Sequence, residues 1–198
     1  MSFDKVTQFE NKISTFFGSK YAVATDSCTH ALELCIRLKK LKNIVIPKRT
    51  YASIAMLSKK LNIKLIFQEQ NWIDYYYING SKIIDAAVYW KKNGYIKNTY
   101  MCLSFQYQKH LNIGKGGMIL LDNYSDYRKL IRMSYDGRER NIPWRKQNIK
   151  DVGFHYYLTP ESAEVGIKIF EKVKNKSPKK WTSNDYPDLS KMKFTKYI

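Results

Sequence analysis

Residues 102–122 read CLSFQYQKHLNIGKGGMILLD, and this stretch decides the fold that the sequence predicts. Two apolar runs, Tyr100–Ser104 and Met118–Asp122, flank its centre and are typical of buried strands. Lys109 lies between them, five residues before Gly114 and its glycine-rich turn. Most lysines are exposed and solvated. On an irregular connection between two strands a lysine can reach a pocket, so Lys109 is a candidate catalytic residue.

Strands and helices alternate on both sides of this stretch. Apolar spacing predicts helices at Phe3–Phe17, around Leu32–Leu38, and at Tyr51–Lys60, Ser125–Ser134 and Pro160–Lys172. Shorter apolar runs predict strands at Tyr21–Thr25, Asn43–Ile46, Lys64–Phe67 and Lys82–Asp85. Tyr75–Ile78 runs into Asn79-Gly80, which is a hairpin turn signal. The alternation predicts an α/β fold with three layers, α/β/α, and a mostly parallel sheet. Such sheets bind ligands at the carboxyl ends of their strands.

Length and composition favour one reduced, intracellular domain. The chain has 198 residues, enough for a well-buried core, and it lacks an apolar run of about 18 residues that would span a membrane. The polar start does not fit a signal peptide. The three cysteines form no motif for a metal or a disulfide framework. We therefore expect a cytoplasmic protein with no membrane partner and no bound metal.

The formal net charge of +18 lies well outside the roughly 2–8 units that are typical of a small domain. It indicates an anionic partner, or else an AT-rich genome whose codons favour lysine. The charge is spread along the chain without a recognisable nucleic-acid module, so nucleic acid is possible but not favoured. Only the last part concentrates lysines. We expect one domain over residues 1–173 and a basic irregular tail over residues 174–198.

Four features follow predicted strands and are expected to meet in one pocket. Residues 26–29, Asp-Ser-Cys-Thr, open a helix where free N–H groups bind anions, although this feature alone favours simple N-capping by Asp26 or Ser27. Asp85 ends an apolar strand, where a buried carboxylate needs a cation or a donor. Tyr51 is placed to cover a ring or to pack in the core. Ser104 is placed to bind a phosphate or to finish its strand.

Together these are the groups that pyridoxal phosphate needs: a lysine to carry it, a carboxylate for its ring nitrogen, an aromatic cover and a phosphate cup. Their order resembles the DegT/DnrJ/StrS sugar aminotransferases, which have the fold of the large domain of pyridoxal-phosphate transferases. The segment from Ser104-Phe105 to Lys109 and on to Gly114-Lys-Gly-Gly-Met118 resembles the family's Ser-Phe-x-x-x-Lys and Gly-Glu-Gly-Gly-Met motifs without a gap. The resemblance covers roughly residues 6–173.

The resemblance implies a role for each position. Lys109 would carry the cofactor, Asp85 would pair with its ring nitrogen, and Tyr51 would stack on its ring. Phosphate ligands would come from the remaining matched positions: Cys28, Thr29, Ser104 and, from a neighbouring subunit of a homodimer, His155.

Several positions depart from the family pattern. Cys28 replaces a glycine, Val88 replaces a glutamine or histidine near the cofactor hydroxyl, and Tyr157 replaces an arginine. Only a short link separates Phe67 from Lys82, and we expect that the family's N-terminal substrate loop and small C-terminal domain are missing.

The resemblance implies a compact aminotransferase that moves an amino group from an amino acid such as glutamate to a keto-sugar nucleotide. Two alternatives stay open. The first alternative is a non-catalytic remnant of an aminotransferase that binds a partner or an anionic ligand. The second is one half of a split enzyme.

Overall fold

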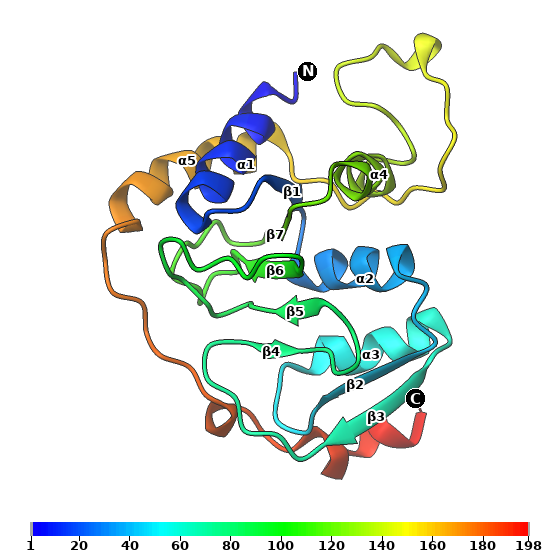
Figure 1. Ribbon diagram of the computed structural model, residues 1–198, viewed down its shortest axis with the longest axis vertical. Coiled ribbons are helices and arrows are strands. Elements are labelled where there is room, and N and C mark those ends of the chain that lie inside the picture. Colours follow the sequence, from blue (N-terminus) through cyan, green and yellow to red (C-terminus); the bar gives the residue numbers. More distant parts are fainter. Residues whose placement is uncertain (1, 198) are drawn as a thin grey trace.

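The computed structural model describes residues 2–197 and consists of two sheets between layers of helices (Figure 1). The larger sheet has the strand order β1-β7-β6-β5-β4, and the smaller sheet pairs β2 with β3. The strands are β1 (Tyr21–Thr25), β2 (Asn43–Pro47), β3 (Lys64–Gln68), β4 (Tyr76–Tyr77), β5 (Ile83–Asp85), β6 (Tyr100–Ser104) and β7 (Gly117–Leu121). Each lies within a residue or two of a predicted strand.

The predicted α/β class is confirmed, but the expectation of a mostly parallel sheet is wrong. Of the four neighbouring pairs in the larger sheet of the described chain, only β5 with β6 is parallel. The reason lies in the short connections, because β4–β5 and β6–β7 return on themselves without a crossover helix. Even so, β1, β5 and β6 all run in one direction, so their carboxyl ends share one edge of the sheet.

The predicted hairpin at Asn79-Gly80 is confirmed and joins the two sheets. Gly80 takes a φ of +75°, which the turn requires and which favours glycine. The N–H of Asn79 donates to the carbonyl of Val45 in β2 at 2.9 Å. The pair β2–β3 therefore continues the larger sheet beyond the hairpin, at the lower side of Figure 1.

Helices cover both faces, as predicted for three layers. The helices α1 (Asp4–Phe17) and α5 (Pro160–Val173) pack together on one face, and α2 (Cys28–Leu38), α3 (Ala52–Leu61) and α4 (Tyr124–Ser134) cover the other (Figure 1). Alternate residues of each strand divide between two apolar cores. In β1, Val23 joins the core under α2, while Ala22 and Ala24 join the core under α1. None of the helices in the described part of the chain is long and apolar enough to cross a membrane.

Residues after α5 return to the sheet edge and pack there. They form three short 3-10 turns at Ser183–Asp185, Leu189–Lys191 and Lys193–Tyr197, and another 3-10 turn, Trp144–Lys146, lies in the loop after α4. The N–H of Ser183 donates to the carbonyl of Trp72 at 3.0 Å, and the N–H of Leu189 donates to the carbonyl of Lys48 at 2.8 Å. The side chain of Leu189 is buried. This packing brings the segment beside the carboxyl ends of the strands (Figure 1).

Candidate active site

A cavity of about 450 Å³ lies where β1, β2, β5 and β6 end. Its lining includes six of the seven predicted site residues: Cys28, Thr29, Tyr51, Asp85, Ser104 and Lys109. These residues meet because β1, β5 and β6 run in the same direction, so that the segments after them begin at one edge of the sheet. We call the buried part of this cavity, formed by Cys28, Tyr76, Asp85, Ser104 and Lys109, the inner end.

Asp85 is the buried carboxylate of the inner end. Its Oδ2 accepts a hydrogen bond of 2.7 Å from the hydroxyl of Tyr76, and its Oδ1 accepts one of 3.1 Å from the N–H of Ala87. Burial raises the pKa of Asp85, while the two hydrogen bonds and the positive charge of Lys109 act in the opposite direction. The net shift is upward, so this carboxylate is one that a further cation would stabilise.

Tyr76 is a site residue that the sequence did not reveal. Three consecutive tyrosines, Tyr75 to Tyr77, predict a strand but do not say which of them faces the site. The antiparallel register of β4 and β5 pairs Tyr76 with Asp85 directly. The Tyr76 hydroxyl also lies 2.8 Å from the Oγ1 of buried Thr50, which completes a hydrogen-bonded chain from Thr50 to Asp85. This chain fixes the orientation of the carboxylate.

Lys109 enters the cavity from the turn that the sequence predicted. Its N–H donates to the carbonyl of Gln106 at 2.8 Å, which closes that turn. The Nζ lies 5.2 Å from the ring centre of Trp181, and it forms no ion pair or hydrogen bond with any residue in 2–197. Burial lowers the pKa of Lys109, although Cys28 and Asp85 act to raise it. A lysine with a lowered pKa is neutral, and hence nucleophilic, over a wider range of pH.

The start of α2 forms the cup that the sequence predicted for an anion. Ser27 caps the helix and accepts a hydrogen bond from the N–H of His30 at 3.2 Å. The Cys28 side chain, where the family has glycine, turns into the core, and its Sγ donates to the carbonyl of Cys102 at 3.5 Å. Burial raises the pKa of this thiol, which keeps it protonated as a donor. The substitution therefore leaves the backbone at the helix start free to face the cavity.

Gly117 allows this close approach of strand and helix. A Cβ on Gly117 would lie 2.4 Å from the backbone nitrogen of Cys28, so only glycine fits there. Ser104 pairs with Gly117 across β6 and β7 and presents its hydroxyl at the same edge. The hydroxyl of Thr29 lies 2.7 Å from that of Ser53 on α3. These groups place backbone donors and hydroxyls together at one end of the cavity.

Tyr51 and Lys115 lie at the mouth. Tyr51 precedes α3, and 61% of its surface is exposed, so one ring face is available for stacking. Lys115 occupies the glutamate position of the glycine-rich motif and lines the cavity 3.3 Å from the Oδ2 of Asp26. Lys115 belongs to the glycine-rich motif, but the sequence gave no reason to place its side chain in the site.

Five residues form the other side of the cavity, which we call the outer wall: Trp72, Asp74, Trp181, Asp185 and Tyr186. They come from the link between β3 and β5 and from the segment after α5. The N–H of Asp74 donates to the carbonyl of Trp181 at 2.9 Å, which joins the two segments. The ring centres of Trp72 and Tyr186 are 5.4 Å apart. The sequence missed this wall because the tail has no periodic pattern.

His155 is the one predicted residue that lies outside the cavity. Its side chain is 70% exposed, and its Nδ1 lies 3.0 Å from the Oδ2 of Asp136. A contact between His155 and the cofactor phosphate in a neighbouring subunit therefore stays a prediction.

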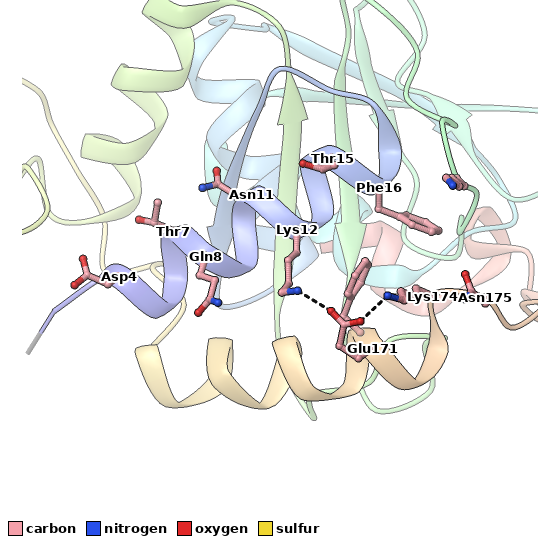
Figure 2. A pocket seen from close by; sticks show the side chains of 12 residues that line it. Asp4, Thr7, Gln8, Asn11, Lys12, Thr15, Phe16, Glu171, Lys174 and Asn175 are labelled. Carbon is pink, nitrogen blue, oxygen red and sulfur yellow. Dashed lines mark hydrogen bonds and ion pairs between the residues drawn. The ribbon is translucent and has the colours of Figure 1, made fainter.

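A larger depression of about 820 Å³ lies between α1 and α5, away from these residues (Figure 2). Figure 2 shows Lys12 and Lys174 both directed at Glu171, and each Nζ is 2.6 Å from one of its oxygens. Three of the charges that line this depression are thus paired with one another near the surface. The smaller cavity, with its unpaired lysine and buried carboxylate, is the better candidate for chemistry.

Solved structures share this fold over most of the chain. AtS13 from Actinomadura melliaura aligns with a TM-score of 0.75 and 16% identity, over 87% of this chain and 61% of that one. The sugar aminotransferase CalS13 from Micromonospora echinospora aligns with a TM-score of 0.72 and 13% identity, over 85% and 60%. A GDP-4-keto-6-deoxymannose-3-dehydratase with bound GDP-perosamine aligns with a TM-score of 0.64 and 19% identity, over 86% and 61%.

The chain thus spans about three fifths of the length of these structures. Among curated protein sequences, no relative matches. Spr1654 from Streptococcus pneumoniae, which is similar in fold, has structures in a PLP form and a PMP form.

The family comparison agrees with the resemblance noted in the sequence. One family model matches in two segments, residues 1–88 and 79–186, which overlap at the hairpin turn and β5. The second segment extends past α5 to the end of the outer wall. Because the two matches together cover most of the chain, it belongs to the DegT/DnrJ/EryC1/StrS aminotransferase family.

Proposed function

We propose that this protein moves an amino group from an amino acid such as glutamate to a keto-sugar nucleotide, with pyridoxal phosphate as its cofactor. The observation that carries the proposal is the inner end of the cavity. It combines an unpaired lysine of lowered pKa with a buried, hydrogen-bonded carboxylate, and a helix start lies beside both.

The residues present fit this cofactor. Buried Asp85 has two donors and a raised pKa, so a protonated ring nitrogen is the cation that it lacks. The start of α2 and the Ser104 hydroxyl offer donors for a phosphate, and the helix dipole favours negative charge there. Tyr51 has an exposed ring at the mouth that can cover a flat ligand. A cavity of about 450 Å³ is within the usual range for cofactor sites.

When bound, pyridoxal phosphate supplies a carbonyl carbon that holds the amino group and a ring that takes up negative charge. Lys109 would hold the cofactor through Nζ, for which its lowered pKa is favourable. When free, the same Nζ would accept the proton from the α-carbon of the amino donor. The Asp85 carboxylate would pair with the protonated ring nitrogen, and the hydroxyl of Tyr76 holds this carboxylate in position.

A sugar nucleotide as the acceptor is supported by two observations. One structure of similar fold contains GDP-perosamine, which is a sugar nucleotide. The net charge of +18 favours an anionic ligand such as a diphosphate.

We expect the protein to be a homodimer, with His155 near the second subunit. The loop after α4 carries exposed apolar residues near His155, among them Trp144 at 66% and Val152 at 81% exposed. Exposed apolar groups in one loop are consistent with an interface. Light scattering on the purified protein tests this expectation, and a fully active monomer would contradict it.

The function is tested by adding pyridoxal phosphate, recording the visible absorbance band and reducing with borohydride before peptide mapping. We expect a phosphopyridoxyl mass on the Lys109 peptide and then amino transfer in a screen of sugar nucleotides with glutamate. Absence of both the band and the adduct would favour the non-catalytic alternative.

A further inference from the structure

We propose that the outer wall binds the hexose ring of the sugar nucleotide, with Trp181 as the ring on which the hexose packs. The inference rests on the proposed function and deepens it, because it assigns the hexose-binding site to the segment after α5.

Position is the first argument. The Nζ of Lys109 lies 5.2 Å from the ring centre of Trp181, and both residues line the same cavity. Reacting atoms must approach to about 3–3.5 Å before a bond forms. The part of the substrate that carries the reacting carbonyl therefore lies next to Trp181. In a sugar nucleotide this part is the hexose, while the base is separated from it by a diphosphate and a ribose.

The chemistry of the wall is the second argument. Trp181 and Tyr186 have ring centres 6.0 Å apart and present apolar faces to the cavity, which suits the C–H face of a hexose. Asp74 and Asp185 add carboxylates, which accept hydrogen bonds from hydroxyl groups. One oxygen of Asp185 already accepts from the N–H of Thr182 at 2.8 Å. Among residues 2–197, neither its other oxygen nor either oxygen of Asp74 has a hydrogen bond or an ion pair.

The same carboxylates orient the substrate. Asp74 and Asp185 repel phosphate, so the diphosphate lies away from them and the hydroxyl-bearing ring lies against them. The Nζ of Lys179 lies 3.9 Å from the ring centre of Trp181, and Lys179 lines a neighbouring cavity of about 160 Å³. Lys179 therefore contacts the indole of Trp181 without occupying the proposed hexose site. The result is a wall that is aromatic and acidic in a chain whose net charge is strongly positive.

The experiment compares Trp181→Ala with Tyr124→Ala, an aromatic residue at the start of α4 that is 59% exposed and does not line the cavity. Full-length protein is loaded with pyridoxal phosphate, reduced with borohydride to block the chemistry, and titrated by calorimetry. The probes are GDP-mannose, UDP-glucose and dTDP-glucose, each beside its own nucleoside diphosphate. In the wild type we expect at least one hexose nucleotide to bind more tightly than its nucleoside diphosphate.

Trp181→Ala should reduce that affinity about tenfold, as expected for the loss of one aromatic stacking contact. It should leave the affinity for the nucleoside diphosphate unchanged. Tyr124→Ala should leave the affinity for both ligands unchanged. Trp181→Phe should restore most of the loss, and the melting temperature of each variant reports its folding. Asp185→Asn should lower the affinity for the hexose nucleotide and leave the affinity for the nucleoside diphosphate unchanged.

The proposal is overturned if no hexose nucleotide binds better than its nucleoside diphosphate, or if Trp181→Ala binds both ligands as the wild type does. These outcomes are distinct from failure of the proposed function. Failure of the proposed function would be seen in the loading step, as the absence of a visible band and of the Lys109 adduct. In that case the titration can be made on the protein without cofactor.

Discussion

The inner end and the outer wall of the same cavity are built in opposite ways. The residues of the inner end lie in strands, at the start of a helix or on the turn between β6 and β7, and Asp85 is held there by two hydrogen bonds. The residues of the outer wall lie on irregular segments or a short 3-10 turn, where Trp181 is half-buried and Asp185 is exposed. The inner end therefore has fixed positions for chemistry, while the outer wall offers a surface that can vary with the substrate.

This contrast has an energetic basis. A strand end is fixed by its ladder of hydrogen bonds and by the core beneath it, as for Asp85 between β4 and β6. The segment after α5 is held by isolated bonds such as that from the N–H of Ser183 to the carbonyl of Trp72. Local opening should consequently be easier at the outer wall than at the inner end.

The largest effect is expected from Lys109→Ala, which removes the attachment point and the proton carrier together. Amino transfer should fall by about ten-thousandfold or more, as for the loss of a catalytic acid–base group. Borohydride reduction followed by peptide mapping should find no adduct. Lys12→Ala, in the depression between α1 and α5, is the matched control and should keep both the adduct and the activity. An active Lys109→Ala protein would contradict the assignment of the inner end.

Asp85→Asn should lower the rate of amino transfer by about a hundredfold or more, while the adduct on Lys109 remains detectable. The reason is that the amide cannot pair as an anion with a protonated ring nitrogen, so electrostatic stabilisation is lost. Steady-state rates and the peptide map are measured on the same sample. Full activity in this variant would exclude the role of Asp85.

The same variant tests the pKa of Asp85. Since burial raises the pKa above its unfolded value, the contribution of Asp85 to stability is fully present at acidic pH and is lost as pH rises through the folded pKa. Relative to Asp85→Asn, the wild type without cofactor should therefore become less stable between acidic and neutral pH. Urea unfolding at several pH values measures this difference, and an opposite trend would mean that the pKa is lowered.

Tyr76→Phe is expected to reduce activity about tenfold, because it removes one hydrogen bond to a charged group. Loss of this donor raises the pKa of Asp85 further, so the acidic limb of the pH–activity profile should move to higher pH. Tyr77→Phe is the control, because the neighbouring side chain is partly exposed and pairs with Ile84 instead. An unchanged profile in Tyr76→Phe would leave Tyr76 with a packing role only.

The smallest effect on the inner end is expected from Leu189→Ala. Leu189 is 1% exposed, and its truncation should loosen the segment after α5. We expect faster limited proteolysis after α5 and a severalfold loss in affinity for a hexose nucleotide, with normal attachment of the cofactor to Lys109. Val165→Ala, at a 45% exposed position of α5, serves as the control. Equal loss of cofactor and sugar binding would show that the two regions are not independent.

Much of the inner end could be predicted from the sequence. Asp85, Ser104 and Lys109 each follow an apolar run, and a strand end is a local feature that periodicity reveals. The direction of the strands could not be predicted in the same way. It depends on whether each connection crosses over or turns back, and the connection between β6 and β7 turns back, so that these two strands are antiparallel.

What the sequence determined by itself was local: the strand ends, the helix start at Cys28, the turn that carries Lys109 and the glycine at position 117. Only the tertiary structure decided which tyrosine faces Asp85, because that depends on the register of β4 against β5. It also decided that Trp181 and Tyr186 reach the site, since roughly a hundred residues separate them from Asp74 and Asp85 in the chain. Periodicity describes neighbours along the chain, whereas contacts across such distances depend on how the whole core packs.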